Sequence, residues 1–441
     1  MSLPTPAEVW ELQDALHAKA KAEPGYRFYA LYDKLYREDV LARAWVQCRD
    51  NGGACGVDGQ SFAEIKSYGE ERWLRELTQE LRTKTYRPQA VRRVYMPKPD
   101  GKRRPLGIPT LKDRVVQTAA TLILGPIFEA DLQPEQYAYR NNRNAHQAIN
   151  RVHRLLTQGH WGVVDADLSG YFDSIPHREL MQCVARRVCD KAMLRLIKQW
   201  LEMPVEETDE RGGKRRSNPG RKTHRGTRQG APISPLLSNL YMRRFVLGWK
   251  TLGWQDRLKA EIVNYADDFV ILCRTPAERA REVMEEMMER LKLTVNERKT
   301  RTCRIPRDTF DFLGYTFGQC YRARTGQRYI GTRPSRKSVQ SLCRQISEMT
   351  GRNRLELAPV ELTAQINRTL KGWTNYFRGG AVSHAYRAVE NHTRFRLRQW
   401  LCAKHQYPGR GTGRFPNEYL QGKLGLMRLR GMSFNPLCAN A

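Results

Sequence analysis

The spacing of apolar residues alternates along the chain between helical and strand-like patterns, and it predicts a protein that contains both. Residues 1–90 read mostly as helices, and an aromatic stripe there has the spacing of a helix face that packs in a core. The stripe consists of Tyr26, Tyr29, Tyr32, Leu35 and Tyr36. A second strong helical pattern covers residues 277–292, with a shared apolar face of Val283, Met284, Met287, Met288 and Leu291. We expect these methionines to lie in the core rather than on a binding surface.

Strand-like patterns begin after residue 90. The predicted strands are residues 91–96, 104–108 and 161–168, and the two arms of a hairpin at 261–273. A turn at 98–101 separates the first two strands, and residues 266–268 form the tip of the hairpin. Residues 202–228 fit neither pattern, because they are rich in Gly, Lys and Arg and read as a polar insertion.

Charge is the most unusual property of the composition. The 441 residues include 76 Lys and Arg against 46 Asp and Glu, which gives a formal net charge of +30. This excess argues against an ordinary metabolic enzyme and predicts a polyanionic partner, usually a phosphate backbone. No apolar run approaches the roughly 20 residues of a membrane helix. The 10 cysteines include no C-x-x-C pair, so we expect reduced thiols and a cytosolic protein.

The last part of the chain is more basic than the rest. Residues 331–441 contain 19 Lys and Arg against 5 Asp and Glu. Aromatic residues are interleaved with them, namely Trp373, Tyr376, Phe377, Phe395 and Trp400. A solvated surface would not need this asymmetry, and a basic helical bundle that binds nucleic acid explains it better.

Three aspartates beside apolar strand residues are the main candidates for chemistry. Asp167 ends one predicted strand, and Asp267 and Asp268 lie at the tip of the predicted hairpin. Charges placed so close to buried strands are costly unless compensated, and hard divalent cations compensate them through oxygen ligands. Two Mg²⁺ ions about 3.5–4 Å apart can activate a 3′-hydroxyl and stabilise a leaving pyrophosphate. The alternative interpretation is three ordinary strand-end aspartates.

The motifs around these aspartates resemble those of reverse transcriptases. Tyr265-Ala266-Asp267-Asp268 resembles the Y-x-D-D box, and residues 167–173 (D-L-S-G-Y-F-D) are similar to the first catalytic motif. The other similar segments are residues 104–109 (R-P-L-G-I-P), 229–235 (Q-G-A-P-I-S-P), 312–314 (F-L-G), and Asn296 with Lys299. Together with residues 371–377 (K-G-W-T-N-Y-F), this ordered set resembles the reverse transcriptase/maturase encoded by bacterial group II introns.

The resemblance implies an α+β fold of the right-hand polymerase type, with fingers, an antiparallel palm sheet and a helical C-terminal thumb/X (maturase) domain. Residues 1–90 would form an N-terminal helical extension and the start of the fingers, and residues 91–160 the fingers. Residues 161–325 would form the palm, with a fingers segment and the insertion at 202–228. Residues 326–441 would form the thumb/X domain with a short basic DNA-binding-like tail. The chain resembles the endonuclease-lacking branch of the family.

The resemblance also implies the roles of individual residues. The catalytic and metal-binding residues would be Asp167, Asp267 and Asp268, with the Leu168 carbonyl as an additional ligand for two Mg²⁺ ions, or for Mn²⁺ as a substitute. Phe172 would be the steric gate that excludes a ribose 2′-hydroxyl. The other nucleotide-binding residues would be Lys98, Arg104, Gln229, Gly230 and Lys299, of which Lys299 is equally well explained by a structural role. Plain core packing is the alternative for Phe172.

The implied partners are nucleic acids and nucleotides. They are structured group II intron RNA, an RNA template with a DNA primer, dNTPs and target DNA, with no membrane partner. The RNA-binding candidates are Lys371, Arg378, Arg394, Arg396 and Arg398. The protein would be cytoplasmic in a bacterium, nucleoid-associated during integration, and either a monomer or a dimer. Two segments depart from the family pattern, because Arg228 stands where Pro is common and residues 140–146 read R-N-N-R-N-A-H.

The main hypothesis is therefore an RNA-directed DNA polymerase that also assists intron splicing and mobility. Three alternatives stay open on the sequence. The protein could be chiefly an RNA-binding splicing cofactor, a domesticated reverse transcriptase in repair or phage defence, or an RNA-dependent RNA polymerase. Phe172 distinguishes the last of these, because a bulky gate rejects ribonucleotides by steric clash. His146 and Trp373 are expected to be structural residues.

Overall fold

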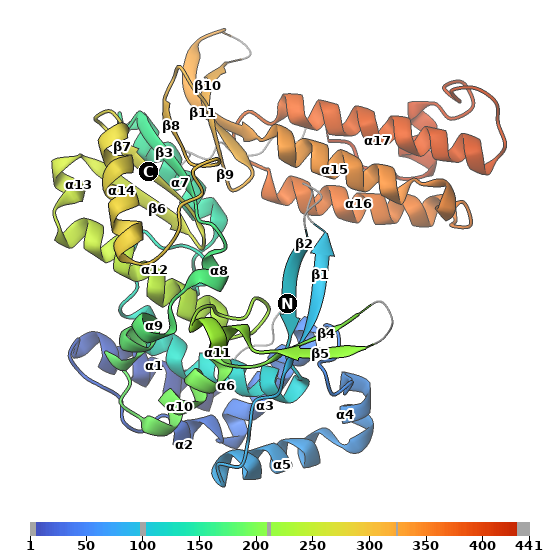
Figure 1. The fold of residues 1–441 in the computed structure, drawn as a ribbon. Helices are drawn as coiled ribbons and strands as arrows, with labels where there is room; N and C mark the ends of the chain where they lie inside the picture. The colour runs from blue at the N-terminus through green and yellow to red at the C-terminus, as the bar shows by residue number, and fades with distance from the viewer. Residues whose placement is uncertain (1–5, 98–102, 210–212, 323–324, 430–441) are drawn as a thin grey trace. The chain divides into compact units, whose positions relative to one another are not determined.

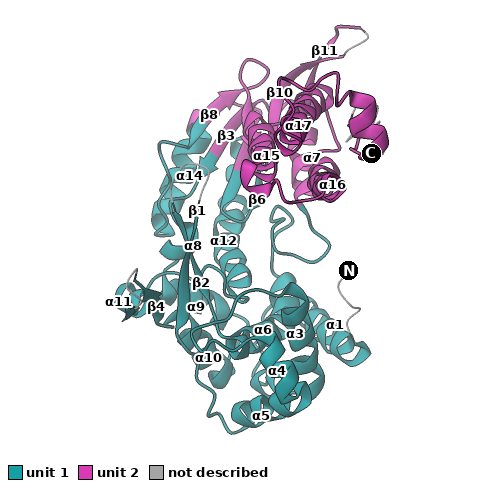
Figure 2. Cartoon of the chain, turned by 90° about the vertical axis from the view of Figure 1, so that its right-hand side faces the viewer, with its two compact units in different colours: residues 1–144, 166–269, 279–301 teal, residues 145–165, 270–278, 302–441 magenta. Residues whose placement is uncertain are grey.

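The structure is a computed structural model that describes residues 6–97, 103–209, 213–322 and 325–429. It divides into two compact units, which Figure 2 shows in different colours. Unit 1 contains residues 1–144, 166–269 and 279–301, and unit 2 contains residues 145–165, 270–278 and 302–441. These units follow other boundaries than the fingers, palm and thumb expected from the sequence, so the expected domain limits stay a prediction.

The N-terminal part of unit 1 is helical, as the sequence predicts. Its helices are α1 (Ala7–Ala22), α2 (Tyr32–Leu35), α3 (Glu38–Asn51), α4 (Phe62–Tyr68), α5 (Glu70–Arg82) and α6 (Leu111–Glu129). Local signals fix several ends. Gly52 follows α3 with a φ of 61°, and Ser61 and Glu64 form a capping box at the start of α4. The Thr110 side chain caps α6 by accepting a hydrogen bond from the Asp113 N–H.

The expectation that the tyrosine stripe forms a buried helix face is wrong for the first half of the stripe. Residues 26–31 are not helical, and the Tyr29 side chain is 71% exposed. Only Leu35 of the stripe is fully buried, and the helix that contains it is one turn long. The backbone of Phe28 instead hydrogen-bonds to residues 187, 189 and 190, so a contact distant in sequence overrides the local helical spacing.

The two predicted strands after residue 90 are confirmed as β1 (Val91–Pro97) and β2 (Arg103–Ile108), an antiparallel pair (Figure 1). The turn expected at 98–101 lies outside the described residues. The polar insertion is not a plain loop, because it forms β4 (Val205–Thr208), β5 (Lys214–Ser217) and the short helix α11 (Pro219–Thr223). Strand β4 pairs in parallel with β1, which gives a four-stranded sheet of order β2-β1-β4-β5.

A second four-stranded sheet has the order β6-β7-β3-β8. Its strands are β3 (Gly162–Asp167), β6 (Ala260–Tyr265), β7 (Asp268–Cys273) and β8 (Arg301–Arg304). The predicted strand at 161–168 and the predicted hairpin at 261–273 are both confirmed. The predicted helix at 277–292 is α14 (Glu278–Arg290), and its Met284, Met287 and Met288 are buried in the core as expected.

The helices that accompany this sheet complete unit 1. They are α8 (Tyr171–Ser174), α9 (His177–Ala185), α10 (Lys191–Leu201), α12 (Ser234–Thr251) and α13 (Trp254–Arg257). Asp190 caps the start of helix α10, because its carboxylate accepts hydrogen bonds from the N–H groups of Ala192 and Met193. Helix α12 places Leu237, Tyr241 and Phe245 in the core at intervals of four residues.

Unit 2 combines a small sheet with a helical bundle. The sheet has the order β11-β10-β9, from β9 (Phe310–Phe312), β10 (Tyr315–Tyr321) and β11 (Arg328–Pro334). The helices are α7 (Ala145–Thr157), α15 (Arg336–Met349), η1 (Arg352–Arg354), α16 (Pro359–Tyr376), α17 (Ser383–Lys404) and the π-helical turn η2 (Tyr419–Lys423). Helices α15, α16 and α17 run side by side around a core that includes Leu362, Ile366 and Trp400 (Figure 1).

These elements confirm an α+β fold with antiparallel strand pairs and a helical C-terminal region. Trp373 packs against Phe377 and Tyr386, and His146 hydrogen-bonds the Tyr376 carbonyl, so both have the expected structural contacts. No helix within the described parts of the chain is long and apolar enough to span a membrane. The basic tail expected at the C-terminus lies mostly outside the described residues.

Candidate active site

Two of the three candidate aspartates lie at the tight turn between β6 and β7. Ala266 has a left-handed φ of 59°, a conformation that few non-glycine residues adopt. The fully buried Asn264 holds this turn, because its Nδ2 donates to the Ala266 carbonyl at 2.8 Å. The Asn264 N–H in turn donates to the Glu135 carbonyl at 2.9 Å. The turn therefore presents Asp267 and Asp268 from a backbone fixed on both sides.

The third aspartate, Asp167, ends β3 and contacts the segment that follows α14. The Lys299 ammonium lies 3.2 Å from its Oδ2, and the Asn296 Nδ2 donates to the same oxygen at 3.0 Å. The Asn296 N–H also donates to the Asp167 carbonyl at 2.8 Å. Asn296 and Lys299 were expected together as one family motif. In the structure, both side chains contact the carboxylate of Asp167.

The donor set fits a hard divalent cation, because it consists of carboxylate oxygens and one candidate backbone carbonyl. Asp167 already binds a cation, the Lys299 ammonium. Among the described residues, no group of three or more His, Cys, Asp or Glu side chains is placed to hold a metal ion. The assignment of Asp167, Leu168, Asp267 and Asp268 as metal ligands therefore stays a prediction.

The expected steric gate and the Q-G pair lie on adjoining segments. The Thr227 N–H donates to the Phe172 carbonyl at 2.6 Å, and the Gln229 Nε2 donates to Asp173 Oδ2 at 3.1 Å. Gly230 has a φ of 100°, and a Cβ there would lie 2.5 Å from the Gly107 carbonyl oxygen. Only glycine fits this close approach to β2. Asp173 belongs to the first catalytic-motif segment, and its contact with the Gln229 side chain was not expected from the sequence.

Arg228, which replaces the family's usual proline, links this loop to the start of β4. Its Nη2 donates to the Met203 carbonyl at 2.7 Å. Burial lowers the pKa of Arg228 to about 10, and the nearby Arg93 lowers it in the same direction. Burial raises the pKa of Asp173, while Arg93 and Arg228 oppose that rise. The departure from the family pattern thus adds a positive charge beside the residue that holds Gln229.

Of the two basic residues expected to contact the triphosphate, the structure describes only one. Lys98 lies outside the described residues. Arg104 is exposed on β2, and its charge acts on Tyr139. Burial raises the pKa of the Tyr139 phenol, with Asp267 as the next cause and Asp268 in the same direction, whereas Arg104 lowers it. The same segment adjoins β6, because the Tyr137 N–H donates to the Asn264 carbonyl at 3.0 Å. No periodic or motif signal in the sequence pointed to Tyr139.

Comparisons with known proteins decide the family. The model for the reverse transcriptase (RNA-dependent DNA polymerase) matches residues 96–317, which is half of the chain. The chain belongs to the reverse transcriptase family. This reverse transcriptase is accordingly an RNA-directed DNA polymerase. A second model, for the group II intron maturase-specific domain, matches residues 339–415.

Several curated proteins resemble this reverse transcriptase. Protein YkfC of Escherichia coli (strain K12) is 32% identical over 369 residues, which are 74% of this chain and 93% of the relative. The group II intron-encoded protein LtrA of Lactococcus lactis subsp. cremoris is 33% identical over 227 residues, 51% of this chain and 36% of LtrA. Nuclear intron maturase 2, mitochondrial, of Arabidopsis thaliana is 32% identical over 111 residues, 25% of this chain and 15% of the relative.

Within the maturase-specific region, three of the expected RNA-binding arginines make internal contacts. Arg394 forms an ion pair with the buried Glu390. Arg396 donates to the Ser347 carbonyl at 3.0 Å and to Thr350 Oγ1 at 3.1 Å. These bonds join α17 to the end of α15.

The third of these arginines, Arg398, donates to the Phe415 carbonyl at 2.9 Å and to Asn417 Oδ1 at 3.0 Å. Lys371 and Arg378 are exposed instead, and no side chain in the described structure pairs with either of them. The RNA-binding role of all five residues stays a prediction, and the structure favours Lys371 and Arg378 for it.

Proposed function

We propose that this RNA-directed DNA polymerase works with two Mg²⁺ ions held by Asp167, Asp267 and Asp268, with the Leu168 carbonyl as a further ligand. Ions in such a site activate a primer 3′-hydroxyl and stabilise the leaving pyrophosphate. The observation that carries the proposal is the turn of β6 and β7. Its left-handed Ala266 and the buried Asn264 hold the backbone from which Asp267 and Asp268 project, and such preorganisation would serve charge stabilisation in a reaction.

The residues around the carboxylates would select and orient the dNTP. The Phe172 ring would exclude a 2′-hydroxyl, and its backbone is fixed by the Thr227 N–H. Gln229 is held by Asp173, and the Gln229–Gly230 backbone lies against Gly107 of β2, so this loop can approach a nucleotide without moving. Arg104 on β2 would contact the triphosphate through the fork of donors in its guanidinium.

We also propose that the protein binds structured group II intron RNA and assists its splicing and its insertion into target DNA. The match to the maturase-specific domain supports this proposal, as does the excess of 19 basic over 5 acidic residues between 331 and 441. RNA of this kind is recognised mostly by shape and backbone, for which exposed cations such as Lys371 and Arg378 are suited.

The substitution Asp268→Asn separates the two activities. It removes one carboxylate charge at the turn without changing side-chain size, so primer extension on RNA should fall by about 100-fold or more. Splicing assistance should persist, because it needs RNA binding rather than metal-ion chemistry. The matched control is Asp256→Asn, which changes an exposed carboxylate on α13 and should affect neither activity.

Primer extension and intron splicing would be measured side by side for the wild type and both variants. A chelator should stop extension, and added Mg²⁺ or Mn²⁺ should restore it. Loss of both activities in a folded Asp268→Asn protein would contradict the proposed division of labour. Unchanged extension in that variant would contradict the metal-binding role of Asp268.

A further inference from the structure

A large groove of unit 1 contains a buried arginine that the proposed chemistry does not use. The groove has a volume of about 750 Å³, and α1, α3, α6, residues 139–142 and the start of α12 line it. Arg43 projects into it from α3 and is only 6% exposed. This guanidinium has no hydrogen bond or ion pair to any described residue, and its buried Nε has no partner.

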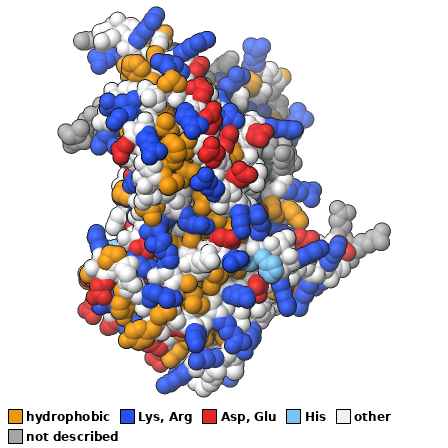
Figure 3. Space-filling view, turned by 60° about the vertical axis from the view of Figure 1, so that its left-hand side comes forward, with side chains coloured by type: hydrophobic (Ala, Val, Ile, Leu, Met, Phe, Trp, Pro, Cys, Tyr) orange, Lys and Arg blue, Asp and Glu red, His pale blue; other side chains and the backbone are white. Residues whose placement is uncertain are grey.

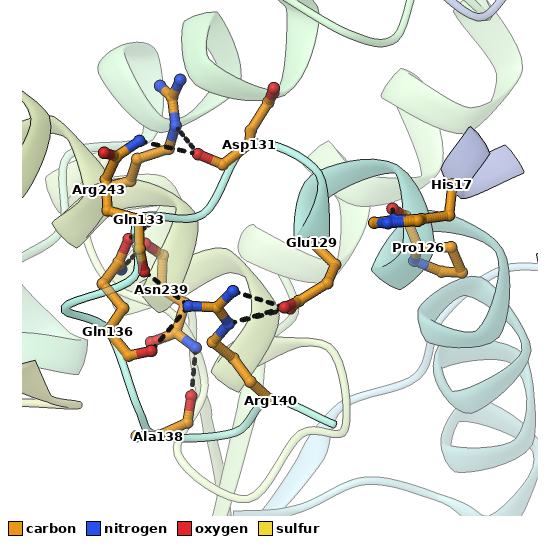
Figure 4. Close-up of polar contacts among 10 residues, drawn as sticks. All are labelled: His17, Pro126, Glu129, Asp131, Gln133, Gln136, Ala138, Arg140, Asn239 and Arg243. Carbon is orange, nitrogen blue, oxygen red and sulfur yellow. Dashed lines mark hydrogen bonds and ion pairs between the residues drawn. The ribbon is translucent and has the colours of Figure 1, made fainter. Parts of the chain in front are cut away.

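Arg140 lines the same groove, but its guanidinium is hydrogen-bonded to protein acceptors. It makes hydrogen bonds to both carboxylate oxygens of Glu129 and to the carbonyls of Gln133 and Gln136, at 2.7 Å for each carbonyl (Figure 4). Its side chain is largely buried. Of these two arginines, only Arg43 lacks a partner among the described residues.

A buried guanidinium without a counter-charge is destabilising, because the lost hydration is not replaced. Buried polar groups in native proteins are almost always paired, so an exception calls for a partner outside the chain. Of the two carboxylates that line the groove, Glu129 is already bound by Arg140, and Asp14 is exposed on α1. An anionic ligand that carries its own charge into the groove would satisfy Arg43.

The rest of the groove has the composition of a site for single-stranded nucleic acid. Trp10 and Tyr139 line it with side chains that are 60% and 57% exposed, and exposed rings of this kind can stack on bases. One end of the groove adjoins the segment beside the active-site turn, because Tyr139 follows Tyr137, whose N–H donates to the Asn264 carbonyl of β6 at 3.0 Å. Pro232, three residues after Gln229, also lines it.

We propose that Arg43 binds a backbone phosphate of the single-stranded RNA template before the template enters the active site, with Trp10 and Tyr139 stacking on its bases. The proposal rests on the RNA-directed DNA polymerase activity of the chain. Arg43 is then a positioning residue. Its unpaired burial is an energetic cost that the free protein bears and that the template offsets.

The test compares Arg43→Met with the wild type on two templates. Both carry the same primer duplex, but one has a long single-stranded 5′ template overhang and the other an overhang of a single nucleotide. Loss of one charge-assisted contact should weaken binding of the long-overhang template about tenfold. Binding of the short-overhang template, and extension by one nucleotide at saturating template, should not change. Arg43→Lys, which keeps the charge, should retain most of the overhang-dependent affinity.

Thermal unfolding provides the second readout. Arg43→Met should melt at the same temperature as the free wild type or higher, because it removes an unpaired buried charge. The matched variant Arg140→Met should melt lower, because it leaves Glu129 and two carbonyls without their donor. A lower melting temperature for Arg43→Met would overturn the proposal in favour of a structural role. Equal loss on both templates would overturn it too.

A third arm separates the template from a small anion. Inorganic pyrophosphate is added to the wild type and to Arg43→Met. If pyrophosphate stabilises the wild type alone and the overhang has no effect on affinity, the groove takes a free phosphate compound and the template assignment is wrong. Loss of extension on both templates in both proteins would instead point to a failure of the polymerase function itself.

Discussion

Among single residues, Phe172 has the clearest expected role, which is to reject ribonucleotides. Its ring lies edge-on to the buried Tyr171, and its carbonyl is fixed by the Thr227 N–H. The ring is only half-buried, so part of it is available to a substrate. A fixed bulky group of this kind discriminates by clash rather than by added affinity.

We expect Phe172→Ala to incorporate ribonucleotides at least about tenfold more efficiently, because the clash with the 2′-hydroxyl is removed. Incorporation of dNTPs should change much less. The measurement is single-nucleotide extension with matched rNTP and dNTP pairs. Efficient rNTP use by the wild type would refute the gate and favour an RNA polymerase.

Asp113 is a second residue with a measurable individual effect, on stability rather than activity. It is buried at the start of α6, where it accepts hydrogen bonds from the Tyr86 hydroxyl and the Gln89 N–H. Burial raises its pKa to about 6, and these hydrogen bonds only partly oppose the rise. Because the folded-state pKa lies above the unfolded one, its contribution to stability is full below about pH 4 and is lost as the pH rises through about 6.

The free energy of unfolding of the wild type should therefore fall relative to that of Asp113→Asn between about pH 4 and pH 7, by on the order of 3 kcal/mol. The comparison is of slopes, because the amide also changes the hydrogen bonds by a constant amount. Denaturant unfolding at several pH values measures it. Parallel curves for the two proteins would show that Asp113 has no raised pKa.

At the scale of elements, the hairpin of β4 and β5 was the least predictable part of the fold. Its sequence is polar and highly charged, and β4 is specified by pairing with β1, more than a hundred residues earlier. The hairpin of β6 and β7 was predictable, because short apolar runs flank a turn that contains two aspartates. Short-range sequence patterns therefore predicted the turn between β6 and β7. The pairing of β4 with β1 leaves no such pattern in the local sequence.

Arg228 links the loop that contains Gln229 and Gly230 to the segment that enters β4. Arg228→Met should raise the KM for dNTPs by about three- to tenfold, because the loop loses the hydrogen bond to Met203 and a charge beside Asp173. The kcat should change little. Arg221→Met, on the exposed surface of α11, is the control. Steady-state dNTP titration measures the effect, and an unchanged KM would show that Arg228 does not position the loop.

The residues proposed for the candidate site come from the sequence motifs, whereas their contacts could not be predicted. The three aspartates, Phe172 and the Q-G pair follow from motif order. The partners of Arg396 and Arg398 could not be read from the sequence, because a surface arginine and one that bonds distant carbonyls look the same there. The same limit applies to Tyr139 and Arg43.

On the scale of the whole molecule, the net charge of +30 is expected to dominate the affinity of the protein for RNA. Lys and Arg side chains are spread across the face in Figure 3, with Asp and Glu side chains among them. Such a distribution favours many weak phosphate contacts over one deep charged site.

RNA affinity should therefore fall steeply with salt, by a log–log slope of about 0.7 for each phosphate contacted on a single strand. A titration of binding at several salt concentrations measures the slope. Substitution of Lys371 and Arg378 to Gln should make the slope shallower, whereas substitution of the internally bonded Arg396 should act through stability. A flat salt response would contradict the electrostatic account.

The central claim is that this reverse transcriptase serves a group II intron. The most direct measurement is to purify the protein from its native host and to sequence the RNA that accompanies it. The account predicts enrichment of one long structured RNA that contains this reading frame, in excised lariat form. A diffuse pool of cellular RNAs, or one unrelated small RNA, would contradict it and indicate a polymerase that the cell uses in repair or phage defence.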